Sequence, residues 1–246
     1  MKIFVAVLLL ISSFSPLYAN TIFYLTKIPN LEIYDLNSSN NIKYLTAEKA
    51  FRVGFRENNV QCDKTDKNNI KKKFDLIKKN FDIYDKNFLK KINLKYVVLC
   101  EDLKVAEIKT AGVPNHKVKT LIVDINFDKR YFERSIHHEI FHMIDDSYKE
   151  LFSYEKWKEF NTPKFKYAEC STCTNKLDLS LNSESKGFLT EYSMSTASED
   201  MAEIFSFLMT DSENLNKILL KDTILTKKTL FLKSAILKID NNFKFN

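Results

Sequence analysis

The residues best suited to chemistry lie in the segment His138-Glu139-Ile140-Phe141-His142, which has the pattern HExxH. On a helix, residues i and i+4 share one face, so both imidazoles can reach one metal ion. With about 100° between successive residues, His142 falls near 40° from His138 and Glu139 near 100°. Glu139 is thus placed to take a proton from a water molecule activated by the metal. The segment predicts a hydrolytic zinc site.

Histidine is scarce in this chain, and its distribution supports the motif. The 246 residues include 4 histidines, three of which are His137, His138 and His142. His137 points about 100° away from His138 on a helix, so we do not expect it to bind the same ion. The apolar residues of the segment occupy the opposite face of the helix. The alternative interpretation is an ordinary amphipathic helix with exposed histidines.

A catalytic zinc site needs a third protein ligand and one open position. Asp145 lies on the correct face but a turn further along, where orienting a ligand histidine is its more natural role. A better ligand is Glu199, which shares a helix face with Glu203 and has the small residues Ala202 and Ser206 beside it. Such a face can pack closely against another helix and present carboxylate oxygens. Taken alone, the same face could be a solvated acidic surface.

These residues resemble the gluzincin metallopeptidases, and most closely the catalytic domain of anthrax toxin lethal factor and its relatives. The resemblance rests on the segment from His138 to Asp146 and on Thr190-Glu191-Tyr192 through Glu199, Ala202, Glu203 and Phe205. It implies that Glu199 completes the zinc site, that Tyr192 assists the reaction and that Glu203 supports a ligand. One departure is Phe141, where such motifs often carry a small residue.

The resemblance implies a zinc metalloendopeptidase that acts on a peptide or protein substrate. Zn²⁺ held by His138, His142 and Glu199 would lower the pKa of a bound water toward about 7. Glu139 would then act as general base, and Tyr192 would donate a hydrogen bond to the developing oxyanion. The segment from Gly112 to Phe127 would contain a strand that pairs with extended substrate. His116 in this segment is expected at the surface.

The N-terminus resembles a secretory signal peptide. Lys2 is followed by the apolar run from Ile3 to Ile11, then by Ser12, Ser13, Ser15 and Pro16, and Leu17-Tyr18-Ala19 offers a cleavage site. The apolar run is shorter than the roughly 20 residues that span a bilayer. We therefore expect cleavage after Ala19, a secreted or periplasmic protein and no later transmembrane segment. Residues 20–246 would form one metallopeptidase-like domain, with strands and helices in 20–110 and the catalytic part in 111–246.

All four cysteines lie after this signal, which suits an oxidising compartment. Cys170 and Cys173 form a CxxC pair, and we favour a local structural disulfide. The alternatives are a redox motif and half of a zinc knuckle, but no second CxxC completes a knuckle. Cys62 and Cys100 are candidates for a second bridge, although connectivity does not follow from the sequence.

The net charge of +6 at pH 7 raises the possibility of an anionic partner. The basic excess is concentrated on a predicted helix between Asp66 and Phe81, whose apolar residues recur at helical spacing. We interpret its lysines as a solvated face and expect no nucleic-acid partner. The rival functions are a catalytically silent zincin-fold binding protein and a basic secreted protein that binds anionic partners. The lysines in question are Lys71, Lys72, Lys73, Lys78 and Lys79.

The order of the predicted elements indicates an α+β fold, a zincin-like domain with a small mixed sheet packed on the helices that carry the motif. We predict a long loop over residues 161–187. Residues 20–60 could shield the cleft. The predicted strands are Thr21–Thr26, Glu32–Leu36, Tyr96–Cys100 and Leu121–Ile125. The predicted helices are Ala47–Glu57, Asp66–Phe81, Lys86–Ile92, one from Tyr131 past Tyr148, Ser198–Met209 and Lys228–Ile239.

Overall fold

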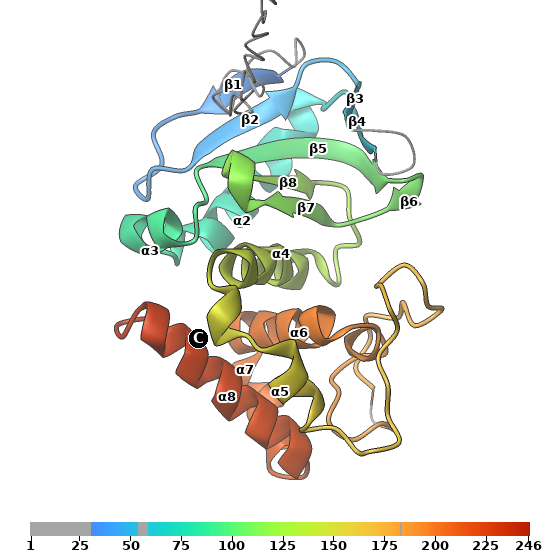
Figure 1. Cartoon of the computed structure of the whole chain (residues 1–246). Coiled ribbons are helices and arrows are strands. Elements are labelled where there is room, and N and C mark those ends of the chain that lie inside the picture. Colours follow the sequence, from blue (N-terminus) through green and yellow to red (C-terminus); the bar gives the residue numbers. More distant parts are fainter. Residues whose placement is uncertain (1–30, 54–58, 183) are drawn as a thin grey trace, which may run out of the picture.

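Strand β5, Tyr96–Val105, organises the sheet (Figure 1). The computed structural model describes residues 31–53, 59–182 and 184–246. The first half of β5 is buried, as expected for a strand inside a sheet that is covered by helices. It pairs in parallel with β2 and β8, while β1 and β7 add antiparallel strands at the two edges. The bounds are β1 Leu31–Asp35, β2 Lys43–Ala47, β7 Gly112–Asn115 and β8 Thr120–Asp124.

The second half of β5 leaves this layer and pairs with other strands. It is antiparallel to β4, Val60–Asp63, and to β6, Ile108–Lys109, while β3, Phe51–Val53, pairs with β4. A disulfide between Cys62 and Cys100 joins β4 to β5 inside a small second hydrophobic cluster. The described strands therefore form one mixed, eight-stranded sheet in which β5 is common to both parts.

Seven α-helices and three short 3₁₀ helices complete the described part of the chain. Side-chain caps explain several helix starts, because Asp66 accepts a hydrogen bond from the backbone of Asn68 in α2 and Thr196 accepts one from Glu199 in α6. The α-helices are α2 Lys67–Asp82, α3 Lys86–Lys91, α4 Phe132–Ser147, α5 Tyr154–Lys158, α6 Ala197–Thr210, α7 Ser212–Leu219 and α8 Thr223–Ile239. The 3₁₀ helices are η2 His116–Val118, η3 Lys149–Leu151 and η4 Tyr192–Met194.

Helix α4 lies between the sheet and the C-terminal helices (Figure 1). One side of it faces β7 and β8, and the other packs along α6. Phe141 on α4 is fully buried, with its ring 5.3 Å from that of Phe152 and 5.7 Å from that of Phe205. The bulky residue at this motif position therefore fills the core behind the histidines.

The α+β class and the mixed sheet are confirmed, but several predicted elements are wrong or incomplete. The helix expected over Ala47–Glu57 is absent in its described part, where β2 ends at Ala47 and β3 follows. Ala47 and Phe51 are instead buried in the cluster around the Cys62–Cys100 disulfide, so long-range pairing overrides the local apolar spacing. Strand β5 runs on to Val105, and α8 begins at Thr223. The strand expected over 21–26 and the signal peptide lie outside the described residues.

The lysine-rich helix α2 and the loop agree with the sequence analysis. Lys71, Lys72 and Lys79 are exposed, while Ile70, Ile77 and Phe81 are buried. Lys73 and Lys78 are only partly exposed, and Lys73 donates to the Ile125 carbonyl instead of facing water. Between α5 and η4 the described residues form no helix or strand, apart from an isolated bridge between Leu181 and Thr190. No helix in the described ranges has the length and apolar character needed to cross a membrane.

Candidate metal centre

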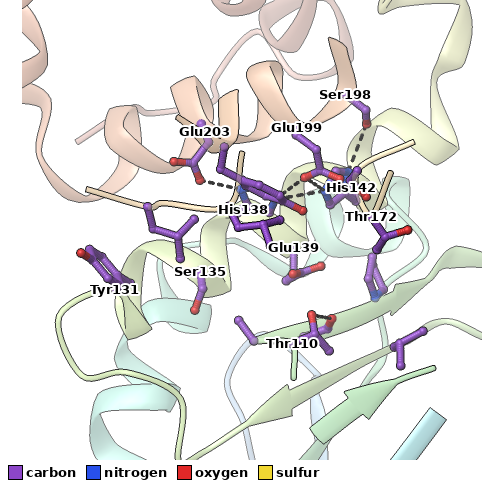
Figure 2. Close-up of a pocket in the computed structure, with 18 of the residues that line it drawn as sticks. Thr110, Tyr131, Ser135, His138, Glu139, His142, Thr172, Ser198, Glu199 and Glu203 are labelled. Atoms are coloured by element: carbon purple, nitrogen blue, oxygen red, sulfur yellow. Dashed lines mark hydrogen bonds and ion pairs between the residues drawn. The ribbon is translucent and has the colours of Figure 1, made fainter. Parts of the chain in front are cut away.

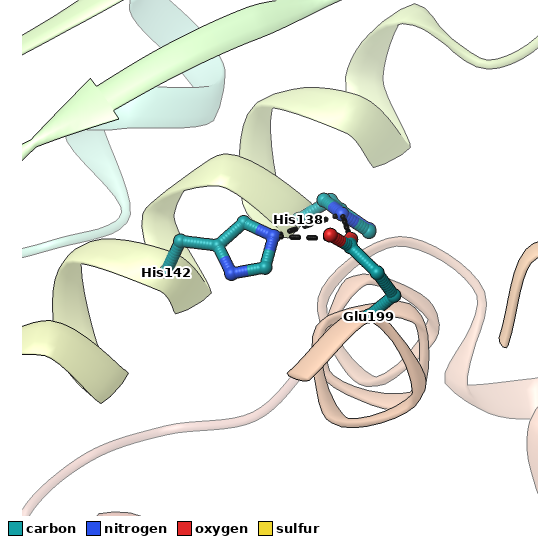
Figure 3. A group of neighbouring side chains, drawn as sticks. All are labelled: His138, His142 and Glu199. Atoms are coloured by element: carbon teal, nitrogen blue, oxygen red, sulfur yellow. Dashed lines mark hydrogen bonds and ion pairs between the residues drawn. The ribbon is translucent and has the colours of Figure 1, made fainter. Parts of the chain in front are cut away.

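Helices α4 and α6 bring three potential metal ligands together (Figure 3). His138 Nε2 lies 2.8 Å from Glu199 Oε2, and His142 Nε2 lies 3.2 Å from the same oxygen. The two imidazole Nε2 atoms are 3.2 Å apart. The two histidines are one turn apart on α4, and Glu199 lies in the first turn of α6, where Thr196 caps the helix. The residues singled out as ligands from the sequence thus converge on one point.

The outer ring nitrogens of both histidines have partners of their own. His138 Nδ1 lies 2.9 Å from Glu203 Oε1 and can donate to this buried carboxylate. His142 Nδ1 lies 3.3 Å from Ser198 Oγ, which donates to Asp145 Oδ2 at 3.1 Å. Glu203 therefore contacts a histidine directly, whereas Asp145 reaches its histidine through Ser198. With Nδ1–H engaged in this way, each Nε2 is the ring atom that can bind a metal ion once its proton is displaced.

The charges on and around His138, His142 and Glu199 suit the binding of a cation. Burial lowers the pKa of His138, but hydrogen bonds and charge from Glu199 and Glu203 outweigh burial and raise it to about 10. Burial raises the pKa of Glu199, but the two histidines lower it well below its usual range. Two imidazole nitrogens and a carboxylate oxygen within 4.8 Å of one another make a set of ligands suited to zinc. His138, His142 and Glu199 therefore form a suitable set of ligands for Zn²⁺.

Glu139 lies on the side of α4 that faces the strands and lines the same cleft (Figure 2). It is 9% exposed, and burial raises the pKa of its carboxyl, opposed by the positive charge of His138 and His142. Gly112 of β7 passes directly over this side chain, since a Cβ on Gly112 would lie 2.6 Å from Glu139 Cγ. Glu139 is thus held between the edge strand and the ligand histidines, with a carboxyl group that takes up a proton more readily than an exposed glutamate.

Tyr192 lies in η4, just before α6, with its ring stacked against His138 at a centroid distance of 5.8 Å. Burial and the charges of Glu199 and Glu139 raise the pKa of its hydroxyl. The phenol therefore keeps its proton and can donate it in a hydrogen bond. The residue expected to assist the reaction lies beside the three potential ligands.

These residues line a cleft with a volume of about 620 Å³. Its lower wall consists of the β5–β6 hairpin and β7, and Thr110 faces Glu139 from that side (Figure 2). The wall opposite includes Ser171, Thr172, Leu177 and Leu179 from the 161–187 loop. A disulfide joins Cys170 to Cys173 within this loop. Of the described residues, none before Val105 lines the cleft, so the described part of 20–60 does not shield it.

The remaining histidines lie outside the group of ligands. His137 is 1% exposed and lies 2.7 Å from the Tyr84 hydroxyl and 2.9 Å from Asn80 Oδ1. Burial lowers the pKa of His137 to about 3, so its ring is neutral at neutral pH and packs inside the core. His116 is partly exposed, with its Nδ1 3.2 Å from Asp146 Oδ2. Both positions agree with the interpretation from the sequence.

Several residues of the site escaped the sequence analysis. Ser198 bridges His142 and Asp145, and its place immediately before Glu199 was the only available signal. Arg134 lies one turn before His138, 3.6 Å from Glu203 Oε2, and donates to the Leu179 carbonyl. Gly112 was named only as the start of the segment expected to contain a strand, yet its missing side chain makes room for Glu139. These contacts join residues that are far apart in the sequence.

Comparisons with known proteins agree with this geometry. A family model described as "Putative zinc-binding metallo-peptidase" matches residues 57–239. Among solved structures, the chain is similar to one described as a putative zinc-binding metallo-peptidase from Bacteroides caccae, with 16% sequence identity and a TM-score of 0.52. That similarity covers 92% of this chain and 86% of the other, and at this identity it concerns the fold. Curated proteins give no match.

Proposed function

We propose that this chain, which belongs to the family of putative zinc-binding metallo-peptidases, is a zinc-dependent endopeptidase of the gluzincin type. The observation that carries the proposal is the convergence of His138, His142 and Glu199, with Glu139 beside them in an open cleft. The order of these residues resembles the catalytic domain of anthrax toxin lethal factor, with two histidines on one helix and a glutamate on a later one.

In this proposal His138, His142 and Glu199 hold Zn²⁺, while Glu203 and Ser198 fix the two imidazole rings through their outer nitrogens. When bound, the metal would polarise the scissile carbonyl and make a water molecule nucleophilic at neutral pH. Glu139 takes the proton of the attacking water at its carboxylate and passes it to the departing amine nitrogen. Its raised pKa suits a group that must both accept and return a proton.

Tyr192 has the role of oxyanion donor. Its hydroxyl is protonated at neutral pH because its pKa is raised, and the ring lies against His138. From this position the O–H can donate to the carbonyl oxygen as negative charge develops on it. Ser171, from the 161–187 loop, lines the same cleft as this donor.

The edge strand β7 is the proposed binding site for the substrate backbone. Among the described strands it pairs only with β8, and Pro114, which lacks an N–H, is compatible with an edge position. An extended peptide laid along β7 would pass over Glu139 because Gly112 lies against that side chain. This arrangement would bring a peptide bond to the potential ligands.

We also propose that the protein works in the periplasm or outside the cell, after the signal peptide has been cleaved between Ala19 and Asn20. The sequence of residues 1–19 supports this location. Two disulfides, Cys62–Cys100 and Cys170–Cys173, also suit an oxidising compartment.

The test uses the chain from Asn20 onward, with metal content and peptide cleavage measured on the same samples. The Glu139→Ala variant should retain one zinc per chain and lose hydrolysis, because it removes the base and spares the ligands. The Glu150→Ala variant, which alters an exposed glutamate near the end of α4, is the control and should cleave at the parental rate. A parent protein that binds zinc but cuts no peptide would favour a catalytically silent binding protein instead.

A further inference from the structure

Two large apolar side chains face the cleft from opposite walls and are about half exposed. Ile108 of β6 is 51% exposed, and Leu177 of the 161–187 loop is 55% exposed. Both line the same cavity, although they are far apart in the sequence. Figure 1 shows β6 and this loop, drawn in gold and orange, on the same side of the molecule. Apolar surface exposed inside a binding cleft is a candidate ligand contact, because a ligand that covers it removes it from water.

The wall that carries Ile108 is a preformed hairpin. Val105 pairs with Ile108 across a two-residue turn, in which Ala106 and Glu107 have φ angles of 51° and 68°. These values are those of a turn whose twist matches the flanking strands. The Glu107 carboxylate also accepts a hydrogen bond of 2.5 Å from Gln61 Nε2 on β4. Ile108 is therefore held in place before any ligand arrives.

The opposite wall is fixed at several points. Arg134 donates to the carbonyl of Leu179, two residues after Leu177. At one end of the loop Tyr167 donates to Asp200 Oδ2 at 2.6 Å, and at the other Lys228 donates to the carbonyl of Gly187 at 2.7 Å. The Cys170–Cys173 disulfide closes the stretch that contributes Ser171 and Thr172. Leu177 thus projects from a loop that is tied to the helices below it.

The charges around this end of the cleft favour an uncharged occupant. Arg134 faces Glu203 at 3.6 Å, and Lys109, the neighbour of Ile108, pairs with Asp102 at 2.7 Å, so these charges are compensated. The carboxylates of Asp145 and Asp146, which also line the cleft, lie about three turns further along α4. A cationic side chain would therefore find its partners at the other end of the cleft. An apolar side chain would instead contact Ile108 and Leu177.

We propose that Ile108 and Leu177 form a specificity subsite that binds an apolar side chain of the peptide substrate near the cleaved bond. The inference rests on the proposed peptidase function and adds a substrate preference to it. The leucines and isoleucines of the rest of the surface are not part of this subsite. Leu181 lies in the same loop and is 46% exposed, but it does not line the cleft, so it provides a matched control.

The experiment offers the zinc-loaded chain, from Asn20 onward, a peptide library and identifies the products by mass spectrometry. The parent should favour aliphatic or aromatic residues at one fixed position relative to the cut. The Ile108→Ser and Leu177→Ser variants should each lower kcat/KM for the best apolar peptide by about 10-fold, as expected for a hydrophobic pocket that loses contacts. The double variant should lose the preference, while Leu181→Ser keeps it.

The outcomes separate the two proposals. A parent that cuts no peptide overturns the proposed function, and the subsite with it. Cleavage without an apolar preference at any position overturns the subsite alone. The subsite is also overturned if Ile108→Ser and Leu177→Ser cleave with the parental preference, or if Leu181→Ser changes it equally. Zinc content and thermal unfolding should be the same in all four variants, because the substituted side chains are about half exposed and none of them is a potential metal ligand.

Discussion

Lys228 Nζ lies 2.7 Å from Asp200 Oδ2, and neither side chain has any exposed surface. The same carboxylate oxygen accepts hydrogen bonds from Trp157 Nε1 at 2.8 Å and from the Tyr167 hydroxyl at 2.6 Å. Asp200 follows Glu199 directly in α6, so this buried ion pair ties α8, α5 and the start of the loop to the helix that carries the third potential ligand.

Removing the lysine should be costly to the fold. Lys228→Met would leave the buried Asp200 carboxylate without its counter-ion, and such a loss is expected to lower the free energy of unfolding by about 3–5 kcal/mol. Lys227→Met, which alters the exposed neighbour on α8, should change it little. Urea denaturation of both variants measures the difference. Equal stability of the two variants would show that the ion pair does not stabilise this helix packing.

The contact between Glu203 and His138 should increase the affinity of the site for zinc. Glu203→Ala removes the acceptor 2.9 Å from His138 Nδ1 and frees the imidazole to change its tautomer and orientation. We expect zinc affinity to fall by about 10- to 100-fold. Competition with a chelator measures the affinity without reference to activity. Glu213→Ala, on an exposed position of α7, should bind zinc as the parent does, and a parental affinity in Glu203→Ala would contradict the prediction.

The close approach of Gly112 to Glu139 should matter for catalysis rather than for metal binding. In Gly112→Ala the new Cβ would lie 2.6 Å from Glu139 Cγ and 3.0 Å from the Ile122 carbonyl oxygen, so the base or the strand must shift. A displacement of about 1 Å costs on the order of 100-fold in rate. We therefore expect kcat to fall by that order while zinc content stays at one per chain. Val113→Ala in the same strand is the control, and an unchanged kcat in Gly112→Ala would rule out this role of the glycine.

The buried neutral His137 should contribute to acid instability. Burial lowers the pKa of His137 to about 3 in the folded protein, whereas an unfolded histidine titrates near 6.5. Between these values the unfolded chain binds a proton that the folded chain does not, so stability falls as the pH drops from about 6.5 toward about 3. The contribution approaches 1.4 kcal/mol for each pH unit, as an order of magnitude.

The variant His137→Gln cannot titrate and can still contact Tyr84 and Asn80. Its free energy of unfolding should therefore depend less steeply on pH below about 6.5 than that of the parent. Both proteins are measured with chelator present, so that release of metal at low pH does not contribute. His116→Gln, at the partly exposed histidine, controls for loss of a histidine as such. If the free energy of unfolding depended on pH with the same slope in the parent and in His137→Gln, the prediction would be contradicted.

The sequence alone determined those features that depend on local spacing. The helices that carry His138, His142 and Glu199 could be predicted because helical hydrogen bonds join residues four apart, and apolar spacing then reports which face is buried. The same regularity placed Glu199 and Glu203 on one face of their helix. In α2 it separated the lysines from the buried apolar face. The pairing within CxxC was also favoured, since only two residues separate Cys170 from Cys173.

The tertiary structure decided what depends on distant partners. Ala47 and Phe51 have a spacing that suits a helix, yet Phe51 lies in a strand that pairs with Cys62. Asp200 and Lys228 are 28 residues apart, and the link from Asp145 to His142 passes through Ser198 on another helix. Strand pairing, buried ion pairs and cleft walls bring together residues whose separation along the chain is arbitrary. No local periodicity encodes these partners, so only the folded chain reveals them.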